Sequence, residues 1–129
     1  MSVVRIVFLG TPEFSVPSLQ ALARDEHFKI VKVYTQPDKP AGRNLQIRPT
    51  PVKVAALRLG LDVKSGSSVN TPEILDEIRE LQVDAAVVVA FGQILSEDFL
   101  KLFTLGAVNI HSSLLPRWRG AWRTRSATP

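Results

Sequence analysis

Two hydrophobic patterns alternate along the chain. Short, continuous apolar runs rich in β-branched residues are typical of strands buried on both faces of a parallel sheet. The segments between them have apolar residues at helical spacing. The predicted strands span residues 3–9, 28–34, 61–63, 85–90 and 107–110. The predicted helices span residues 15–24, 52–59, 74–81 and a short stretch from Ser96. This alternation predicts an α/β fold, a Rossmann-like, open, mostly parallel sheet with helices on both faces.

Local signals predict where the helices begin and end. Ser15 can cap the first helix, and Pro17 fits its first turn, where a missing N–H costs nothing. Either Asn70 or Thr71 can cap the third helix. Gly60 is expected to stop the second helix.

The segments that follow the predicted strands are candidate ligand contacts. An open parallel sheet binds ligands outside the carboxyl ends of its strands. The segments expected at that edge are 10–12, 35–36, 91–93 and 109–111. The first does not form the G-x-G-x-x-G turn of a dinucleotide fold, and Pro12 lacks the N–H that a phosphate would need. This argues against a nicotinamide cofactor.

Composition predicts one soluble domain. The 129 residues are 45% hydrophobic and 22% charged, and none is a cysteine, which fits a reducing cytoplasm. The longest apolar run, 85–91, is far shorter than the ~20 residues that cross a bilayer. The amino terminus lacks a signal-peptide layout, and clustered metal ligands are absent from the sequence. Membrane, secreted and metal-dependent classes are therefore not expected.

The net charge of +4 is unevenly distributed. Residues 36–60, within a Pro- and Gly-rich loop and the helix after it, hold five basic side chains and one acidic one. Residues 106–129 hold four arginines and no acid, whereas 61–105 are acidic. This asymmetry favours a polyanionic partner, although solvated surfaces would give the same pattern.

Two polar side chains follow the last predicted strand. Asn109 and His111 are two residues apart, so they point to the same face while the strand continues. An amide and an imidazole can hold and polarise a carbonyl and move a proton near neutral pH. The same residues could instead cap the backbone of the loop. The loop 112–120 suits the wall of a pocket for a flat, partly apolar ligand, or forms a surface cluster of Arg117, Trp118 and Arg119.

Four segments in these positions carry a family resemblance. They are 7–14, 35–43, 87–95 and 109–121. In them the chain resembles the amino-terminal part of the methionyl-tRNA formyltransferases. The Asn-x-His-x-Ser-Leu-Leu-Pro element is shared by the wider formyltransferase superfamily, whereas the Gln-Pro-Asp-Lys-Pro-Ala-Gly-Arg loop and the Arg-Trp-Arg-Gly ending are typical of the tRNA enzymes.

The resemblance implies transfer of a formyl group from 10-formyltetrahydrofolate to the amino group of initiator methionyl-tRNA. It implies a metal-free, monomeric enzyme of the cytoplasm or an organelle matrix. Asn109 and His111 match the catalytic pair, expected to hold the formyl oxygen and stabilise charge. The implied folate contacts are Phe91, Gly92, Gln93, Ile94, Leu95, Ser113, Leu114, Leu115 and Pro116. The implied tRNA contacts are Lys39, Arg43 and Arg48.

The chain also departs from the family pattern. The family has a catalytic Asp downstream of the His, but no acidic residue follows Asp98 here. We therefore expect a partial catalytic domain over 1–121, with the later strands missing, and a basic tail over 122–129 outside the fold. Such a fragment would be weak or inactive, and it would dimerise or aggregate through an exposed sheet edge. The alternatives are a glycinamide ribonucleotide or sugar-nucleotide formyltransferase, or a non-catalytic fragment that binds folate or RNA.

Overall fold

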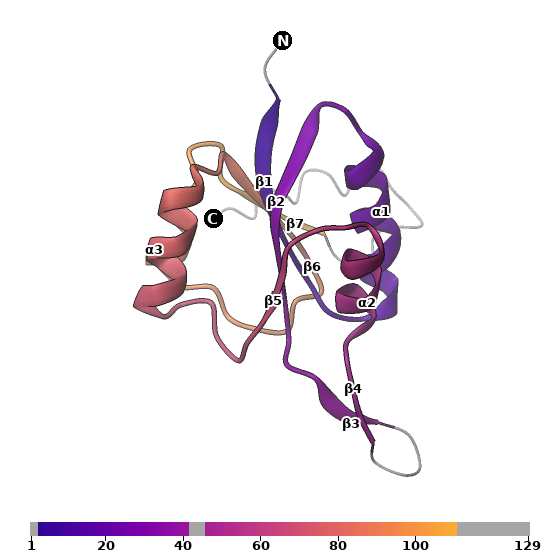
Figure 1. Ribbon diagram of the computed structural model, residues 1–129. Coiled ribbons are helices and arrows are strands. Elements are labelled where there is room, and N and C mark those ends of the chain that lie inside the picture. Colours follow the sequence, from indigo (N-terminus) through magenta and orange to yellow (C-terminus); the bar gives the residue numbers. More distant parts are fainter. Residues whose placement is uncertain (1–2, 42–45, 111–129) are drawn as a thin grey trace.

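A five-stranded parallel sheet forms the centre of the protein (Figure 1). The computed structural model describes residues 3–41 and 46–110. The strands are β1 (Val4–Gly10), β2 (Phe28–Thr35), β5 (Val63–Ser65), β6 (Ala85–Val89) and β7 (Ala107–Ile110). Their spatial order is β5-β2-β1-β6-β7, and every neighbouring pair is parallel. The predicted fold class is confirmed, and the weak strand predicted at 61–63 lies two residues later.

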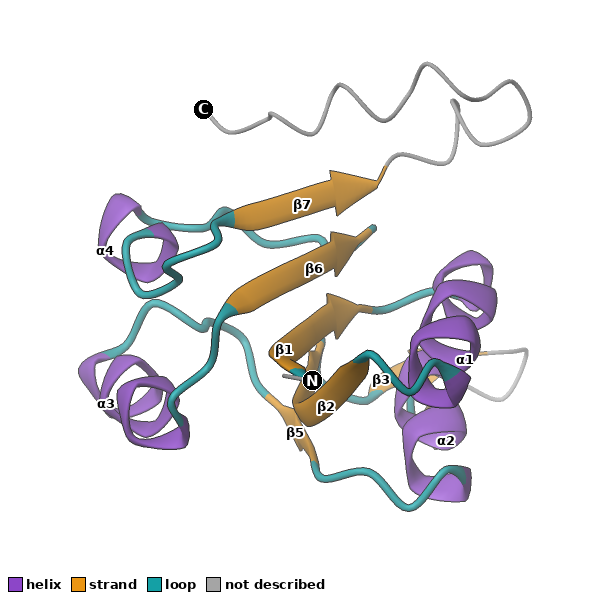
Figure 2. Ribbon diagram, turned by 90° about the horizontal axis from the view of Figure 1, so that it is seen from above, coloured by secondary structure: helices purple, strands orange, loops and turns teal. Residues whose placement is uncertain are grey.

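Helices cover both faces of this sheet (Figure 2). One face carries the short 3₁₀ helix η1 (Glu13–Ser15) followed by α1 (Val16–Arg24) and α2 (Pro51–Arg58). The other carries α3 (Pro72–Leu81) and α4 (Glu97–Leu100). Successive residues of β1 alternate between the two cores: Ile6 and Phe8 pack with the α1/α2 side, Val7 and Leu9 with the α3 side. Burial on both faces explains why the strand is a continuous apolar run.

The order of the strands creates a switch point. From β1 the chain moves outward through β2 to β5 with α1 and α2 on one face. It then crosses back by α3 to β6 and continues outward to β7 on the other side. The direction of winding therefore reverses between β1 and β6, which lie side by side. In open α/β sheets the crevice at such a reversal, beyond the carboxyl ends of the strands, is where ligands bind.

A small hairpin projects from this sheet, within the stretch expected to be a loop (Figure 1). Its strands, β3 (Lys39–Ala41) and β4 (Gln46–Arg48), are antiparallel, and Lys39 pairs with Arg48. The sequence does not predict this hairpin, because its strands have only three residues each and lack the alternating apolar pattern typical of strands.

The structure corrects one expected helix cap and decides between the two alternatives for another. Ser15 occupies the N-cap position of α1, but its hydroxyl donates to the carbonyl of Val89 instead of accepting from the helix. Thr71 caps α3 by accepting from the N–H of Ile74, whereas Asn70 bridges to the loop after β6. Ser15 and Asn70 do not cap because each side chain bonds to a backbone carbonyl distant in the sequence, a partner that the local sequence does not reveal.

Candidate active site

The turns after β1 and β6 meet at the switch point under tight steric constraint. A Cβ on Gly10 would lie 2.9 Å from the carbonyl oxygen of Val89 and 2.9 Å from the ring of Phe8, so only glycine fits. In the turn after β6, Ala90 and Gly92 have φ values of 53° and 86°. A positive φ is uncommon for a residue with a Cβ, and such strain concentrates at functional sites. The turn after β6 is therefore held in a specific, strained shape.

A pocket of about 270 Å³ opens at this point. It is lined by Phe14, Val88, Ala90, Phe91, Gly92, Gln93, Asn109 and Ile110. Asn109 reaches it from β7, where it pairs with Val88 of β6. Asn109 and the three residues Phe91, Gly92 and Gln93, predicted separately as catalytic and folate-contacting, thus line one pocket.

The remaining predicted folate contacts lie elsewhere or outside the described residues. Ile94 is 86% exposed and Leu95 packs against the core on the α3 side, so neither lines the pocket. The side-chain amide of Asn70 holds this segment by donating to the carbonyl of Ile94 at 2.8 Å. The predicted residues outside the described part of the chain are Arg43, His111, Ser113, Leu114, Leu115 and Pro116.

A network of amides and hydroxyls ties the turns together. Gln36, directly after β2, donates from Nε2 to the carbonyl of Gly92 at 2.9 Å and accepts at Oε1 from Gln93 Nε2 at 3.1 Å. Gln93 also donates to the carbonyl of Gly66, beyond β5, at 2.8 Å. Thr11, after β1, donates to the carbonyl of Phe91 at 2.9 Å. The turns after four strands are therefore locked to one another.

One polar atom of this network has no partner among the described residues. Gln93 Oε1 is buried and accepts no hydrogen bond there. A buried acceptor without a donor costs about 1–3 kcal/mol, and such a group calls for a specific explanation. Since Gln93 lines the pocket, a ligand that carries an N–H or amino group could satisfy it.

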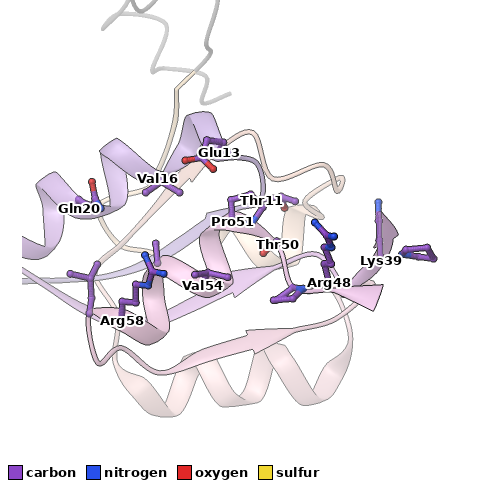
Figure 3. Close-up of a pocket in the computed structure, with 14 residues that line it drawn as sticks. Thr11, Glu13, Val16, Gln20, Lys39, Arg48, Thr50, Pro51, Val54 and Arg58 are labelled. Carbon is purple, nitrogen blue, oxygen red and sulfur yellow. The ribbon is translucent and has the colours of Figure 1, made fainter. Parts of the chain in front are cut away.

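A second, larger cavity of about 760 Å³ lies beside the first, between the hairpin, α1 and α2 (Figure 3). The predicted tRNA contacts Lys39 and Arg48 both line it, together with Arg58 of α2. Thr50 lines this cavity, and its hydroxyl forms a buried hydrogen bond of 2.7 Å with the hydroxyl of Thr35. The cations that the sequence placed in a loop are therefore gathered around a concave surface.

No described helix combines the length and the apolar character needed to cross a bilayer. Within residues 3–41 and 46–110, no three His, Cys, Asp or Glu side chains come together as metal ligands.

Comparison with known proteins identifies the family. The sequence model of a family described as formyl transferase matches residues 4–128. The chain belongs to the formyl transferase family. The methionyl-tRNA formyltransferase of Bdellovibrio bacteriovorus is 57% identical over 122 residues, 94% of this chain and 38% of that protein. The enzyme of the same name from Trichlorobacter lovleyi is 52% identical over 117 residues, 91% of this chain and 37% of that protein. This formyl transferase chain thus spans about two fifths of the length of these relatives.

Solved structures support the fold assignment. Glycinamide ribonucleotide transformylase 1 from Geobacillus kaustophilus superposes with a TM-score of 0.63 at 22% identity, covering 92% of this chain and 63% of that one. The corresponding protein from Symbiobacterium toebii gives 0.62 at 20% identity, covering 97% and 59%. At these identities the likeness concerns the fold of the formyl transferase chain alone.

Sequence reasoning left several residues of the site without a role. Thr11 and Gln36 were placed at the ligand edge, but their contacts with the turn after β6 depend on strands far apart in the sequence. The sequence places Arg58 only within a basic segment, whereas the structure places it in the lining of the larger cavity. Its position on α2 does not indicate a cavity, because the order of the strands in the sheet decides which helices pack side by side.

Proposed function

We propose that the protein transfers a formyl group from 10-formyltetrahydrofolate to the α-amino group of methionyl-tRNA, in translation initiation in the cytoplasm or an organelle matrix. Family membership and the names of relatives at 57% and 52% identity support the reaction and the acceptor. The observation that carries the proposal is the pocket that joins Asn109 to the turn after β6.

Asn109 has the chemistry to hold the reacting carbonyl. Its side-chain amide presents two N–H groups, which can donate to the formyl oxygen and stabilise the negative charge that develops when an amine attacks. The low dielectric of a partly closed pocket strengthens such a hydrogen bond. His111, two residues on and outside the described part of the chain, would take up the proton released by the amine.

The pocket fits a folate by the chemistry of its lining. Phe14 and Ile110, which are both half-buried, provide apolar surface for a flat ring. Gln93 Oε1, buried and without a partner in the described part, can accept from the amino and N–H groups on the edge of such a ring. Bound there, the donor would supply the formyl group that Asn109 holds.

The hairpin provides the positive surface expected for an RNA acceptor. Lys39 and Arg48 lie on paired positions of β3 and β4, and Arg43 belongs to the segment that joins these strands. Contacts of this kind with phosphates are independent of sequence and weaken as salt rises. Binding of tRNA should therefore weaken steeply between low and moderate salt.

The proposal is tested by a single-turnover formylation assay with initiator methionyl-tRNA and 10-formyltetrahydrofolate. We expect measurable transfer of the formyl group to the α-amino group. Asn109→Ala should reduce the rate about 10²–10³-fold, as loss of an oxyanion-stabilising donor does elsewhere. Asn109→Asp keeps the size but removes the N–H donors and should lose as much. Gln82→Asn, at the end of α3, is the control, because Asn tolerates the φ of 54° there.

Three results bear on the proposal. Absence of transfer at saturating donor and acceptor would contradict it, as would an Asn109→Ala variant that reacts at the unmodified rate. Faster transfer to glycinamide ribonucleotide than to methionyl-tRNA would replace the proposed acceptor. Turnover as fast as that of a full-length relative would instead remove only the expectation of weak activity.

A further inference from the structure

Gln36 contacts a part of the site to which its place in the sequence does not point. It directly follows β2 and begins the stretch that leads into the β3–β4 hairpin, which the resemblance links to tRNA. Both polar atoms of its side chain bond instead to the turn after β6. Nε2 donates to the carbonyl of Gly92 at 2.9 Å, and Oε1 accepts from Gln93 Nε2 at 3.1 Å. Gly92 and Gln93 line the pocket with Asn109, whereas Gln36 is not among its described lining residues.

These hydrogen bonds allow only one orientation of the two amides. Both N–H groups of Gln93 Nε2 are used, one toward Gln36 Oε1 and one toward the carbonyl of Gly66 at 2.8 Å. Turning the Gln93 amide over would place its oxygen against two acceptors, because an amide oxygen has no proton to donate. Turning the Gln36 amide over would place its oxygen against the carbonyl of Gly92, and turning both would leave that contact in place. The carbonyl of Gly92 therefore orients Gln36, and Gln36 orients Gln93.

The orientation of Gln93 decides which polar atom remains for a ligand. In the arrangement described, Gln93 Oε1 is the acceptor without a partner among the described residues. Without Gln36, only the carbonyl of Gly66 would orient this amide, and the amide would rotate more freely. A ligand with N–H groups would then have to order the side chain on binding, which costs conformational entropy.

The backbone of the same turn also depends on Gln36. Ala90 and Gly92 have φ values of 53° and 86°, and a positive φ strains a residue that has a Cβ, such as Ala90. Side chains from two strand ends hold the turn in this shape. Thr11 donates to the carbonyl of Phe91, and Gln36 donates to the carbonyl of Gly92. Loss of Gln36 would remove one of these bonds, so the turn would sample other shapes and the lining of the pocket would move with it.

We propose that Gln36 is a positioning residue for the formyl donor. It does not touch the donor but holds Gly92 and Gln93 in the arrangement that binds the donor's ring. Support of this kind governs affinity, because groups that contact a ligand must be held close to their productive geometry. The first residue of the Gln-Pro-Asp-Lys-Pro-Ala-Gly-Arg stretch then serves the donor, whereas Lys39 and Arg43 of the same stretch serve the acceptor. This inference rests on the proposed function, because the donor is the one named there.

The test compares donor affinity in variants of Gln36. Gln36→Met keeps the length of the side chain but removes both hydrogen bonds, and Gln36→Glu keeps an acceptor for Gln93 but cannot donate to Gly92. Each should weaken the binding of 5-formyltetrahydrofolate, a stable isomer of the donor, about 5-fold or more in calorimetric titration, the equivalent of one lost hydrogen bond. Gln46→Met is the matched control, since Gln46 is exposed on β4 and its replacement should leave this binding unchanged.

Kinetics distinguish positioning from a general loss of structure. In steady-state formylation, Gln36→Met should raise the KM for the donor by the same factor as it weakens binding, and it should leave kcat and the KM for methionyl-tRNA unchanged. Partial unfolding would instead lower kcat, because less of the protein is active, and would leave both KM values unchanged.

The outcomes separate this inference from the proposed function. If no formyl group is transferred but both Gln36 variants bind 5-formyltetrahydrofolate more weakly than the unmodified protein does, the proposed function falls and the positioning role stands. If transfer occurs but Gln36→Met binds this folate as tightly as the unmodified protein does, the positioning role is overturned and the proposed function stands. The role is also overturned if Gln46→Met weakens binding as much, if kcat alone falls, or if the unmodified protein does not bind this folate at millimolar concentration.

Discussion

Gly92 shows how a single position controls the shape of the candidate site. Its φ of 86° lies in the region that glycine adopts without strain, and a Cβ there would come 2.7 Å from Gln36 Nε2. The Gln36 side chain is held by two hydrogen bonds. Its Nε2 donates to the carbonyl of Gly92, and its Oε1 accepts from Gln93 Nε2. Gly60 has a similar φ of 75°, but nothing lies within 4 Å of its added Cβ.

We predict that Gly92→Ala destabilises the protein more than Gly60→Ala does. Gly60→Ala should cost about 1–2 kcal/mol of backbone strain alone. Gly92→Ala should cost about 1 kcal/mol more, because the methyl group displaces the Gln36 amide from its hydrogen bonds. Denaturant unfolding measures both. In a Gln36→Ala background the excess should disappear, and an excess that persists there would show that Gln36 is not its cause.

At the scale of elements, threonines fix the starts of two helices in different surroundings. Thr50 caps α2 by accepting from the N–H of Lys53 at 3.0 Å, and its buried hydroxyl also pairs with Thr35. Thr71 caps α3 by a longer bond of 3.3 Å and is half-buried. Only Thr50 therefore combines a cap with a tertiary hydrogen bond between a strand and a helix.

Replacing the two caps should separate these contributions. Thr71→Ala should cost about 1 kcal/mol of unfolding free energy, the usual value for a cap. Thr50→Ala should cost about 2–3 kcal/mol, since it also leaves the buried hydroxyl of Thr35 without its partner. Thr50→Ser keeps the hydroxyl and should recover most of this loss. Equal costs for the two alanine variants in thermal or denaturant unfolding would contradict the assignment.

A cluster of charged and phenolic groups joins β2 to α3. Tyr34 donates to Glu77 at 2.8 Å, and Lys32 donates to Asp62 at 3.1 Å and to Glu77 at 3.3 Å. Burial, with the hydrogen bond to Glu77 and the nearby carboxylate charges, raises the pKa of Tyr34. For Lys32, burial alone lowers the pKa, but hydrogen bonds and attraction to Asp62 and Glu77 outweigh it, so the net pKa lies above its ordinary 10.5.

These raised pKa values predict that the protein loses stability in alkali. Above about pH 10 the unfolded chain releases protons that folded Tyr34 and Lys32 retain, so the unfolding free energy falls as pH rises. The stabilisation is fully present at pH 8. Each retained proton contributes a slope of up to about 1.4 kcal/mol per pH unit. Tyr34→Phe should flatten the decline between pH 10 and 11, measured by denaturant unfolding.

The sequence offers a direct check on this assignment. Tyr34 is the only tyrosine of the chain, so its ionisation can be followed by the ultraviolet absorbance of tyrosinate. Titration of the folded protein should show much less tyrosinate at pH 10.5 than an exposed phenol, which is more than half ionised there. An ordinary phenol titration in the folded state would rule out Tyr34 as a source of the decline.

At the scale of the whole molecule, the sheet ends at β7 within the described residues. There β7 pairs only with β6, and Val108 and Leu105 are 38% and 65% exposed. A strand with an unpaired edge and apolar side chains invites pairing with a second copy.

We predict that the protein self-associates in a concentration-dependent manner. Val108→Lys should shift the equilibrium toward the monomer, because a charged side chain on an edge strand blocks pairing. Ile47→Lys, on the hairpin, is the control, since Ile47 is 63% exposed but distant in the fold from β7. Sedimentation velocity measures the distribution. A monomer at all concentrations, or an equal effect of the two variants, would contradict the prediction.

The sequence by itself determined the elements and the class of fold. Runs such as 85–90 are apolar because strands covered on both faces have no side that faces water. This pattern is local, so it can be recognised from the sequence alone. It also placed Asn109 and the segment 91–93 at one edge, since carboxyl ends of parallel strands share an edge. The family motifs then pointed to formyl transfer before any contact was known.

Only the tertiary structure decided which of these residues meet. The sheet order β5-β2-β1-β6-β7 puts β6 beside β1 and β7, and this order brings Asn109 to the turn that holds Gln93. Three features join residues that are distant in the sequence. They are the hydrogen bond from the Gln36 amide to Gly92, the hydrogen bond from the Ser15 hydroxyl to Val89, and the cavity that Arg58 lines. Such contacts arise from the packing of whole elements. A hydrogen bond or a cavity depends on which residues become neighbours in space, and a local sequence pattern does not predict that.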